Sequence, residues 1–240
     1  MSKKIKQLKA FTLAEVLITL GIIGVVSALT MPTLIQKYNN KITETRLAKF
    51  YSMYNQAIRL ATVEYGEPSS WDFTLQEKDP ETNEIINKSE ESVALFDKYL
   101  GKHIKISSRK EIFDEIENRT YIMNYLADGS AFSFAYHTNT DIHFYPSNPE
   151  KCLKKEINYG ICRFAFSFDP MRAGKPSWEH ASKSEMTPYV YAWNGTKETL
   201  YKGGTYPAGC VMEEYGAYCT QLIAINGWKI PKDYPRKIQY

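Results

Sequence analysis

The feature that most constrains this chain is an apolar stretch near its N-terminus that carries a single charge. The 21 residues from Phe11 to Met31 read FTLAEVLITLGIIGVVSALTM, and Glu15 is the one charged residue among them. About 20 apolar residues are enough for a helix to span the hydrocarbon core of a membrane. The stretch therefore predicts either a membrane-spanning helix or the apolar part of a signal peptide.

A basic segment precedes this stretch. Residues 1–10 contain Lys3, Lys4, Lys6 and Lys9 and no acidic residue, whereas the whole chain has a net charge of only +3. The remainder of the chain is therefore slightly acidic, which argues against nucleic acid as a partner. A basic head before an apolar run is typical of a segment whose N-terminus stays in the cytoplasm, with the following residues on the other side.

Two interpretations of the apolar stretch remain open from these residues. Val26-Ser27-Ala28 fits a signal-peptidase site, and cleavage after Ala28 would release a secreted protein that begins at Leu29. A retained helix explains Glu15 better, because a carboxylate within an apolar helix costs about 2.5–3.5 kcal/mol on insertion scales. A signal that is discarded has no use for such a residue, whereas a retained helix can pair it with a cation.

The segment KAFTLAEVLITLGIIGVVSALTMP resembles the N-terminal motif of type IV prepilins and type II secretion pseudopilins. The resemblance implies that a leader ending at Ala10 is removed, that Phe11 becomes the new N-terminus and is N-methylated, and that Glu15 is the fifth mature residue. It also implies a helix-loosening proline at Pro32. The chain departs from the family at Ala10, where the family usually has glycine.

The resemblance also implies a division of the chain and a set of partners. We expect a cleaved leader over residues 1–10, a transmembrane helix over 11–31, an extracytoplasmic amphipathic helix over 32–64 and a globular α+β head over 65–240. The protein would be single-pass in the inner membrane, with its N-terminus cytoplasmic and its head extracytoplasmic. Expected partners are the membrane, a prepilin peptidase, other pilin or pseudopilin subunits and the inner-membrane assembly platform.

The function implied is that of a structural subunit, in particular a minor one, of a secretion pseudopilus or a type IV pilus. In that family the carboxylate at the position of Glu15 is thought to meet the N-terminal amine of a neighbouring subunit. Two alternatives remain: a pilin-like tip module that binds DNA, a surface or an exported substrate, and a secreted enzyme with an ordinary signal peptide.

Beyond Pro32 the pattern predicts an amphipathic helix that ends before Gly66 and Pro68. Its apolar residues recur at spacings of three and four, which indicates a face that packs on the head. They are Leu47, Phe50, Tyr51, Tyr54, Ile58 and Ala61.

The head is expected to have an antiparallel sheet beside this helix, in an α+β layout that resembles the pilin architecture. We predict a loop over residues 66–89, a short helix that ends at Gly101 and a hairpin turn at Asp128-Gly129. Alternating residues predict strands with one buried and one open face at Ala131–Tyr136 and Cys162–Phe168. Tyr121–Leu126 is the other strand of the hairpin, and Tyr189–Trp193 and Tyr218–Ile225 are predicted as further strands.

The four cysteines form two close pairs in the second half of the chain. No CxxC motif is present, which argues against a zinc ribbon or a thioredoxin-type site. Next to an export segment, the simplest interpretation is two local disulfides, Cys152–Cys162 and Cys210–Cys219. Four cysteines allow three connectivities, and reduced buried thiols are the other possibility.

No catalytic motif is present in the sequence. HExxH, GxSxG, P-loop and GxGxxG patterns do not occur, and the four histidines lack the convergent groups that a catalytic or metal role requires. Carboxylates at Asp79 and Glu81 with Asn83, and at Asp169, Glu179 and Glu185, do not match a calcium motif. We therefore expect no enzyme activity, no metal and no cofactor. Some of the 18 tyrosines could bind glycans or single-stranded DNA by stacking.

Overall fold

The computed structural model describes residues 12–72, 77–78, 85–86, 89–135 and 140–240. The chain divides after Tyr38 into two units, which are described separately below. Both contain part of the first helix. The bounds of the elements are α1 Leu13–Tyr65, η1 Pro68–Ser70, β1 Glu77–Lys78, β2 Ile85–Ile86, α2 Ser89–Tyr99, β3 Ser108–Asp114, β4 Arg119–Tyr125, β5 Ala131–Phe134, β6 Asp141–Tyr145, α3 Pro149–Leu153, β7 Phe164–Ser167, η2 Pro176–Trp178, β8 Thr187–Pro188, α4 Lys197–Lys202 and α5 Cys219–Ile225.

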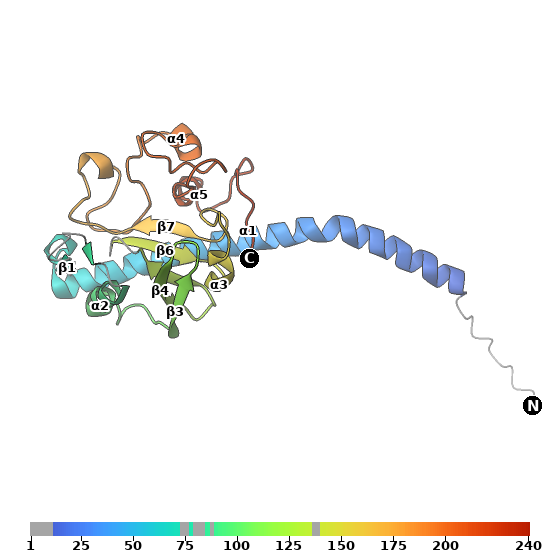
Figure 1. The fold of residues 1–240 in the computed structure, drawn as a ribbon, viewed down its shortest axis with the longest axis horizontal. Coiled ribbons are helices and arrows are strands. Elements are labelled where there is room, and N and C mark those ends of the chain that lie inside the picture. The colour runs from blue at the N-terminus through green and yellow to red at the C-terminus, as the bar shows by residue number, and fades with distance from the viewer. Residues whose placement is uncertain (1–11, 73–76, 79–84, 87–88, 136–139) are drawn as a thin grey trace, which may run out of the picture. The chain divides into compact units, whose positions relative to one another are not determined.

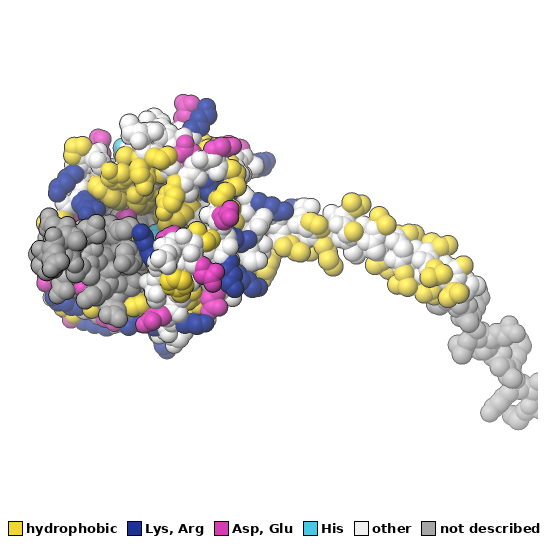
Figure 2. Space-filling model, viewed as in Figure 1, with side chains coloured by type: hydrophobic (Ala, Val, Ile, Leu, Met, Phe, Trp, Pro, Cys, Tyr) yellow, Lys and Arg dark blue, Asp and Glu magenta, His cyan; other side chains and the backbone are white. Residues whose placement is uncertain are grey.

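The first unit, as far as it is described, consists of α1 up to Tyr38. Its large apolar side chains are exposed, and Figure 2 shows them in yellow along the visible side of the helix. By length and composition α1 could span a membrane, and no part of its most apolar window is buried within the protein. The helix continues without interruption through Pro32.

The second unit is an α+β head in which the remainder of α1 packs on a sheet, as the sequence predicts. Phe50 is 1% exposed, and its ring stacks on that of Phe144 with 4.3 Å between the ring centres. Asn55 is also buried, and its side-chain amide donates to and accepts from the backbone of Met186 (3.1 and 2.7 Å). The predicted apolar face of the helix is confirmed: Leu47, Phe50, Tyr54, Ile58 and Ala61 are buried, and Tyr51 is half-buried and packs against the same core.

The sheet is a six-stranded antiparallel meander with the strand order β3-β4-β5-β6-β7-β8. Phe132 lies opposite Phe144, and Phe144 lies opposite Phe164, so a row of phenylalanines crosses three strands beneath α1. The predicted turn at Asp128-Gly129 joins β4 to β5, with Gly129 at φ +78°. The predicted short helix is α2.

Both faces of the central strands are covered, so the expectation of one open face is wrong. Every residue of β5 and of β7 is buried, including Ser133, Ala165 and Ser167 on the face away from α1. The chain that follows β7 returns over this face, and α5 lies against β7. In Figure 1 the sheet accordingly lies between α1 and the segment that carries α4 and α5. The small side chains on the second face permit this close approach.

Two predicted strands are also wrong. The segment Tyr218–Ile225 forms helix α5, because Cys219, Leu222 and Ile223 have the spacing that buries one side of a helix. The segment Tyr189–Trp193 follows directly after β8, where the strand has already ended. Ala192 has φ +54°, which is incompatible with a continuing strand.

Other expectations fall partly or wholly outside the described residues. Asp79, Glu81 and Asn83 lie there, as does Tyr136 at the end of a predicted strand. Strand β3, which pairs with β4 along all seven of its residues, was not predicted from the sequence. Its side chains are mostly exposed, so SRKEIFD lacks the alternation that identifies a half-buried strand.

Candidate functional site

The N-terminal unit presents one carboxylate, that of Glu15, at the start of α1. The hydroxyl and the backbone amide of Thr12 both donate to its Oε2 at 2.8 Å, and the amide of Glu15 donates back to the Thr12 hydroxyl at 3.3 Å. This reciprocal arrangement is a capping box, which satisfies amides that a helix otherwise leaves unpaired. Ala10 and Phe11, where cleavage and methylation are expected, lie outside the described residues.

Apolar side chains surround this carboxylate on the same helix. Leu13 and Ile18 are 78% and 63% exposed. Further along, Gly21 and Gly24 leave open space where a Cβ would be, so another helix could approach the backbone closely there. The segment therefore combines an apolar surface with one acidic group at its N-terminal end.

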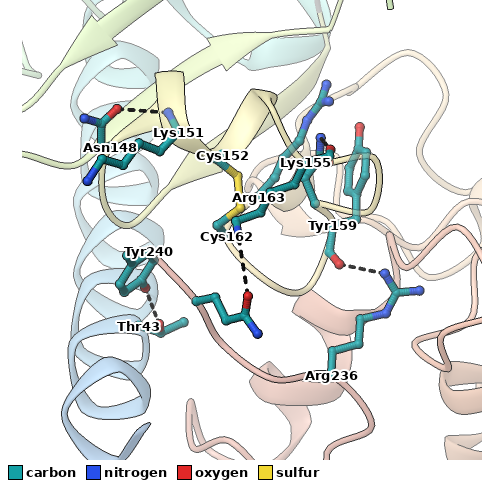
Figure 3. Close-up of a disulfide and its surroundings, with 12 residues drawn as sticks. Thr43, Asn148, Lys151, Cys152, Lys155, Tyr159, Cys162, Arg163, Arg236 and Tyr240 are labelled. Atoms are coloured by element: carbon teal, nitrogen blue, oxygen red, sulfur yellow. Dashed lines mark hydrogen bonds between the residues drawn. A yellow bond between two sulfur atoms is a disulfide. The ribbon is translucent and has the colours of Figure 1, made fainter. Parts of the chain in front are cut away.

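The head contains both predicted disulfides, Cys152–Cys162 and Cys210–Cys219, with Cα atoms 5.7 and 4.8 Å apart. The first joins α3 to the chain just before β7, close to the hydrogen bond between Tyr240 and Thr43 of α1 (Figure 3). The second joins the chain before α5 to the first residue of that helix. Each closes a short loop, which limits the conformations of the unfolded chain.

Arg236 holds the second disulfide loop against the loop that follows α3. Its guanidinium is buried and donates to the carbonyl oxygens of Cys210 and Tyr159, both at 2.7 Å, and to two further carbonyls. Figure 3 shows the bond to Tyr159. Gly216 has φ +91°, and a Cβ there would lie 2.5 Å from Nη1 of Arg236. Glycine is therefore required at this contact.

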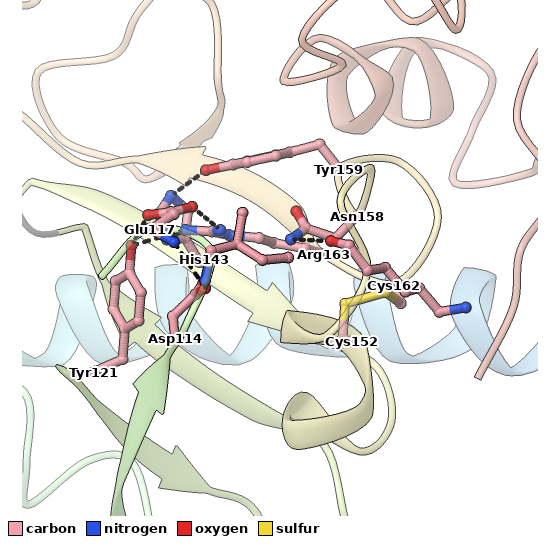
Figure 4. Close-up of polar contacts among 11 residues, drawn as sticks. Asp114, Glu117, Tyr121, His143, Cys152, Asn158, Tyr159, Cys162 and Arg163 are labelled. Atoms are coloured by element: carbon pink, nitrogen blue, oxygen red, sulfur yellow. Dashed lines mark hydrogen bonds and ion pairs between the residues drawn. A yellow bond between two sulfur atoms is a disulfide. The ribbon is translucent and has the colours of Figure 1, made fainter. Parts of the chain in front are cut away.

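On the face of the sheet away from α1, five polar side chains form a buried cluster around Arg163 (Figure 4). Arg163 is fully buried, and its Nη1 donates to Oε1 of Glu117 at 2.7 Å. Its Nη2 donates to Nδ1 of His143 at 2.7 Å and to the hydroxyl of Tyr121 at 3.3 Å. The guanidinium carbon lies 4.5 Å from the ring centre of Tyr159. We call these five residues the Arg163 cluster.

The turn between β3 and β4 positions Glu117 for this ion pair. Oδ1 of Asp114 accepts from the amides of Ile116 and Glu117, at 2.9 and 3.0 Å, and so fixes the turn. Burial opposes the charge on Glu117, but Arg163 and the Tyr121 hydrogen bond outweigh that effect and lower the pKa of the carboxyl. The carboxylate is therefore ionised and partly exposed, beside a guanidinium that is buried.

His143 is neutral in this cluster. Because Nδ1 accepts from Arg163, the ring proton is on Nε2, which donates to the hydroxyl of Tyr159 at 2.8 Å. Burial, followed by the charge of Arg163, holds the pKa of His143 well below its ordinary value. Burial also raises the pKa of Tyr159, so this phenol keeps its proton.

A dependence of stability on pH follows from His143. Above the unfolded-state pKa of about 6.5, neither state binds the proton. Below it, only the unfolded state does, so stability should fall by up to about 1.4 kcal/mol per pH unit. Urea unfolding of the detergent-solubilised chain between pH 8 and 5 should show this loss. The variant H143Q should show a shallower slope than the matched control H180Q. Equal slopes in the two variants would contradict the neutral buried imidazole.

A pocket of about 180 Å³ opens beside the Arg163 cluster. We call it the tyrosine pocket, because five tyrosines line it together with Arg163. They are Tyr121, Tyr159, Tyr189, Tyr206 and Tyr215. Glu117, Arg119, Asp141 and His143 also reach it.

The sequence did not identify this site. The alternation in Cys162–Phe168 predicts an open strand face for Arg163, and His143 belongs to no motif that marks it. The small residues that alternate with the aromatic ones, such as Ala165 and Ser167, were the available signal that a second layer covers this face. Within the ranges that the structure describes, no group of three or more His, Cys, Asp or Glu side chains could hold a metal ion.

The fold defines an α+β protein whose first helix is apolar enough at its N-terminal end to cross a membrane. A model of a family of unknown function, DUF6613, matches residues 33–238, and the chain belongs to this family. The match begins directly after Pro32, so it covers the head and the part of α1 that packs on it. No curated protein and no solved structure matches the chain.

Proposed function

We propose that this protein is a prepilin-like subunit that is anchored in the membrane by α1 and assembles into a type IV pilus or a secretion pseudopilus. The observation that carries the proposal is the single carboxylate of Glu15 at the head of a helix whose apolar side chains have no partner within the described protein. An unpaired carboxylate in the membrane is unfavourable, whereas a pair with an amine of a neighbouring subunit is strongly favoured in low dielectric.

The head supports an extracytoplasmic location. Its two disulfides are of the kind that form and persist in oxidising compartments. With the lysines of residues 1–10 in the cytoplasm, the helix would place the head on the oxidising side of the inner membrane. A prepilin peptidase would remove the leader after Ala10, and methylation of Phe11 would follow. The subunit would work by assembly, in a minor role beside other subunits and an assembly platform.

The role of Glu15 can be tested against its role as a helix cap. The E15A variant should insert and be processed normally, but the amount of chain in sheared filaments should fall by at least about ten-fold, equivalent to about 1.4 kcal/mol per contact. The matched control is T12A, which removes the capping hydroxyl and keeps the carboxylate. It should assemble within about two-fold of the wild type, since loss of a cap costs about 1 kcal/mol of helix stability and no contact between subunits.

Immunoblots of the filament and membrane fractions would measure both variants. Normal assembly of E15A would refute the pairing. An equal loss of filament assembly in E15A and T12A would mean that Glu15 acts only as part of the helix cap.

A further inference from the structure

The tyrosine pocket is a second site, and it lies wholly within the head. It is formed by strands β4, β6 and β7 of the sheet and by the chain between β8 and α5, which brings Tyr189, Tyr206 and Tyr215 over the Arg163 cluster. Tyr215 is 49% exposed, so the pocket is open to solvent on this side. The anchoring helix takes no part in the pocket, so ligand binding there does not depend on assembly of the chain.

The charges in the pocket are balanced. Arg163 is paired with Glu117, and the positive charge of Arg119, the second arginine of the lining, is balanced by the negative charge of Asp141. His143 is neutral, as argued above. A bound anion would meet two carboxylates and a bound cation would meet two guanidinium groups. The balance favours a ligand without net charge.

The remaining groups offer aromatic faces and neutral hydroxyls. Burial raises the pKa of Tyr159, Tyr189 and Tyr215, so each phenol both donates and accepts hydrogen bonds. Such a lining matches a ligand that carries several hydroxyl groups on an apolar ring.

The size of the pocket limits what enters it. A volume of about 180 Å³ is equivalent to about six water molecules at about 30 Å³ each. It lies below the range of about 300–1,000 Å³ that holds drug-sized molecules. One ring with its substituents can enter, and a longer ligand must continue outside.

Aromatic rings extend outward from the pocket. Tyr206 packs edge-on against Tyr191 with 5.1 Å between ring centres, and Tyr191 lies 5.3 Å from Trp178. Tyr191 and Tyr206 are partly exposed. Figure 2 shows hydrophobic side chains gathered on the part of the head where Figure 1 places the chain after β7. A second ring of a ligand held in the pocket could stack on this surface.

We propose that the tyrosine pocket binds one ring of a neutral sugar, with the rest of a glycan chain lying along Tyr206 and Tyr191. The hydroxyls of Tyr189, Tyr206 and Tyr215 bind the sugar hydroxyls, and the tyrosine faces cover its C–H bonds. Single-stranded DNA is the competing ligand for an aromatic surface, but proteins that bind it add a positively charged groove, which this balanced pocket lacks.

Binding can be measured by ligand-observed NMR on the full chain in a polyoxyethylene detergent, which has no sugar or charged headgroup. The probes are methyl glycosides of glucose, galactose, mannose and N-acetylglucosamine, the matching disaccharides, and a thymidine oligonucleotide. We expect saturable binding of at least one glycoside. Tighter binding of its disaccharide would indicate a glycan chain as the source, and equal binding would indicate a free sugar or a terminal ring.

Two variants and a control test the location. Y215A and Y206A remove partly exposed rings and should each weaken glycoside binding about five-fold or more, as loss of an aromatic contact of about 1 kcal/mol implies. The control is Y65A, which removes a tyrosine of similar exposure at the end of α1, outside the pocket. It should leave binding unchanged. The proposal is overturned if no glycoside binds at millimolar concentration, if Y215A and Y206A bind as well as Y65A, or if only the oligonucleotide binds.

Discussion

Replacing Arg163 by methionine should lower the free energy of unfolding of the head by about 3–5 kcal/mol, the usual effect of removing one partner of a buried ion pair. The replacement has a similar length, so the loss comes from the polar groups left behind. Glu117 would lose its counter-charge, Nδ1 of His143 would lose its donor, and the hydroxyl of Tyr121 would lose one of its bonds. Urea unfolding at pH 7.5, followed by tryptophan fluorescence, measures the change.

A double-mutant cycle separates the ion pair from the packing. Glu117→Gln leaves the guanidinium of Arg163 buried without a counter-charge, and it should also be strongly destabilising. The double variant R163M/E117Q should be more stable than the sum of the two effects predicts by at least about 1 kcal/mol. Additive effects would contradict the account of the Arg163 cluster as a coupled unit.

The second large effect is expected at Phe50, whose ring joins α1 to the sheet. Its ring centre lies within 5.5 Å of those of Phe132, Phe144 and Phe166, so one side chain contacts three strands. Phe50→Ala should cost about 3–5 kcal/mol, the range for deletion of a fully buried aromatic ring.

The matched control for this variant is Phe113→Ala in β3. That ring is 56% exposed, and its removal should change the free energy of unfolding by less than about 1 kcal/mol. Equal effects at the two positions would mean that α1 does not depend on Phe50 for its place on the sheet.

The elements that the sequence predicted correctly are those determined by residues close together in the chain. The face of α1 around Phe50, the turn at Gly129 and the two disulfides each follow from neighbours within about ten residues. The spacing of apolar residues in a helix, a glycine in a turn and two cysteines close in sequence can all be recognised within a stretch of that length.

The parts that sequence reasoning missed depend on long-range packing. The apolar residues of the segment that forms α5 were assigned to a strand, whereas their helical spacing places Cys219 in the second disulfide and one side of the helix against β7. The local pattern assigned Arg163 to an open strand face. Its partner Glu117 lies 46 residues away in the sequence, so the pattern of one strand does not include the pair. A buried arginine is favourable only after its distant partners are in place, and a pattern in one strand cannot reveal that.

As a prepilin-like subunit, the protein would combine the membrane helix α1 with the folded head. The family match begins after the apolar segment, so the part of the chain that carries Glu15 lies outside it. The head would then be the part that is displayed, with the tyrosine pocket as its binding site.

The most direct test is the N-terminal mass of the mature protein isolated from its native membrane. The account predicts a chain that begins at N-methylated Phe11, with residues 1–10 absent and Glu15 as the fifth residue. A mature chain that begins at Leu29 would contradict it, because the anchor and the assembly carboxylate would both have been removed with a signal peptide.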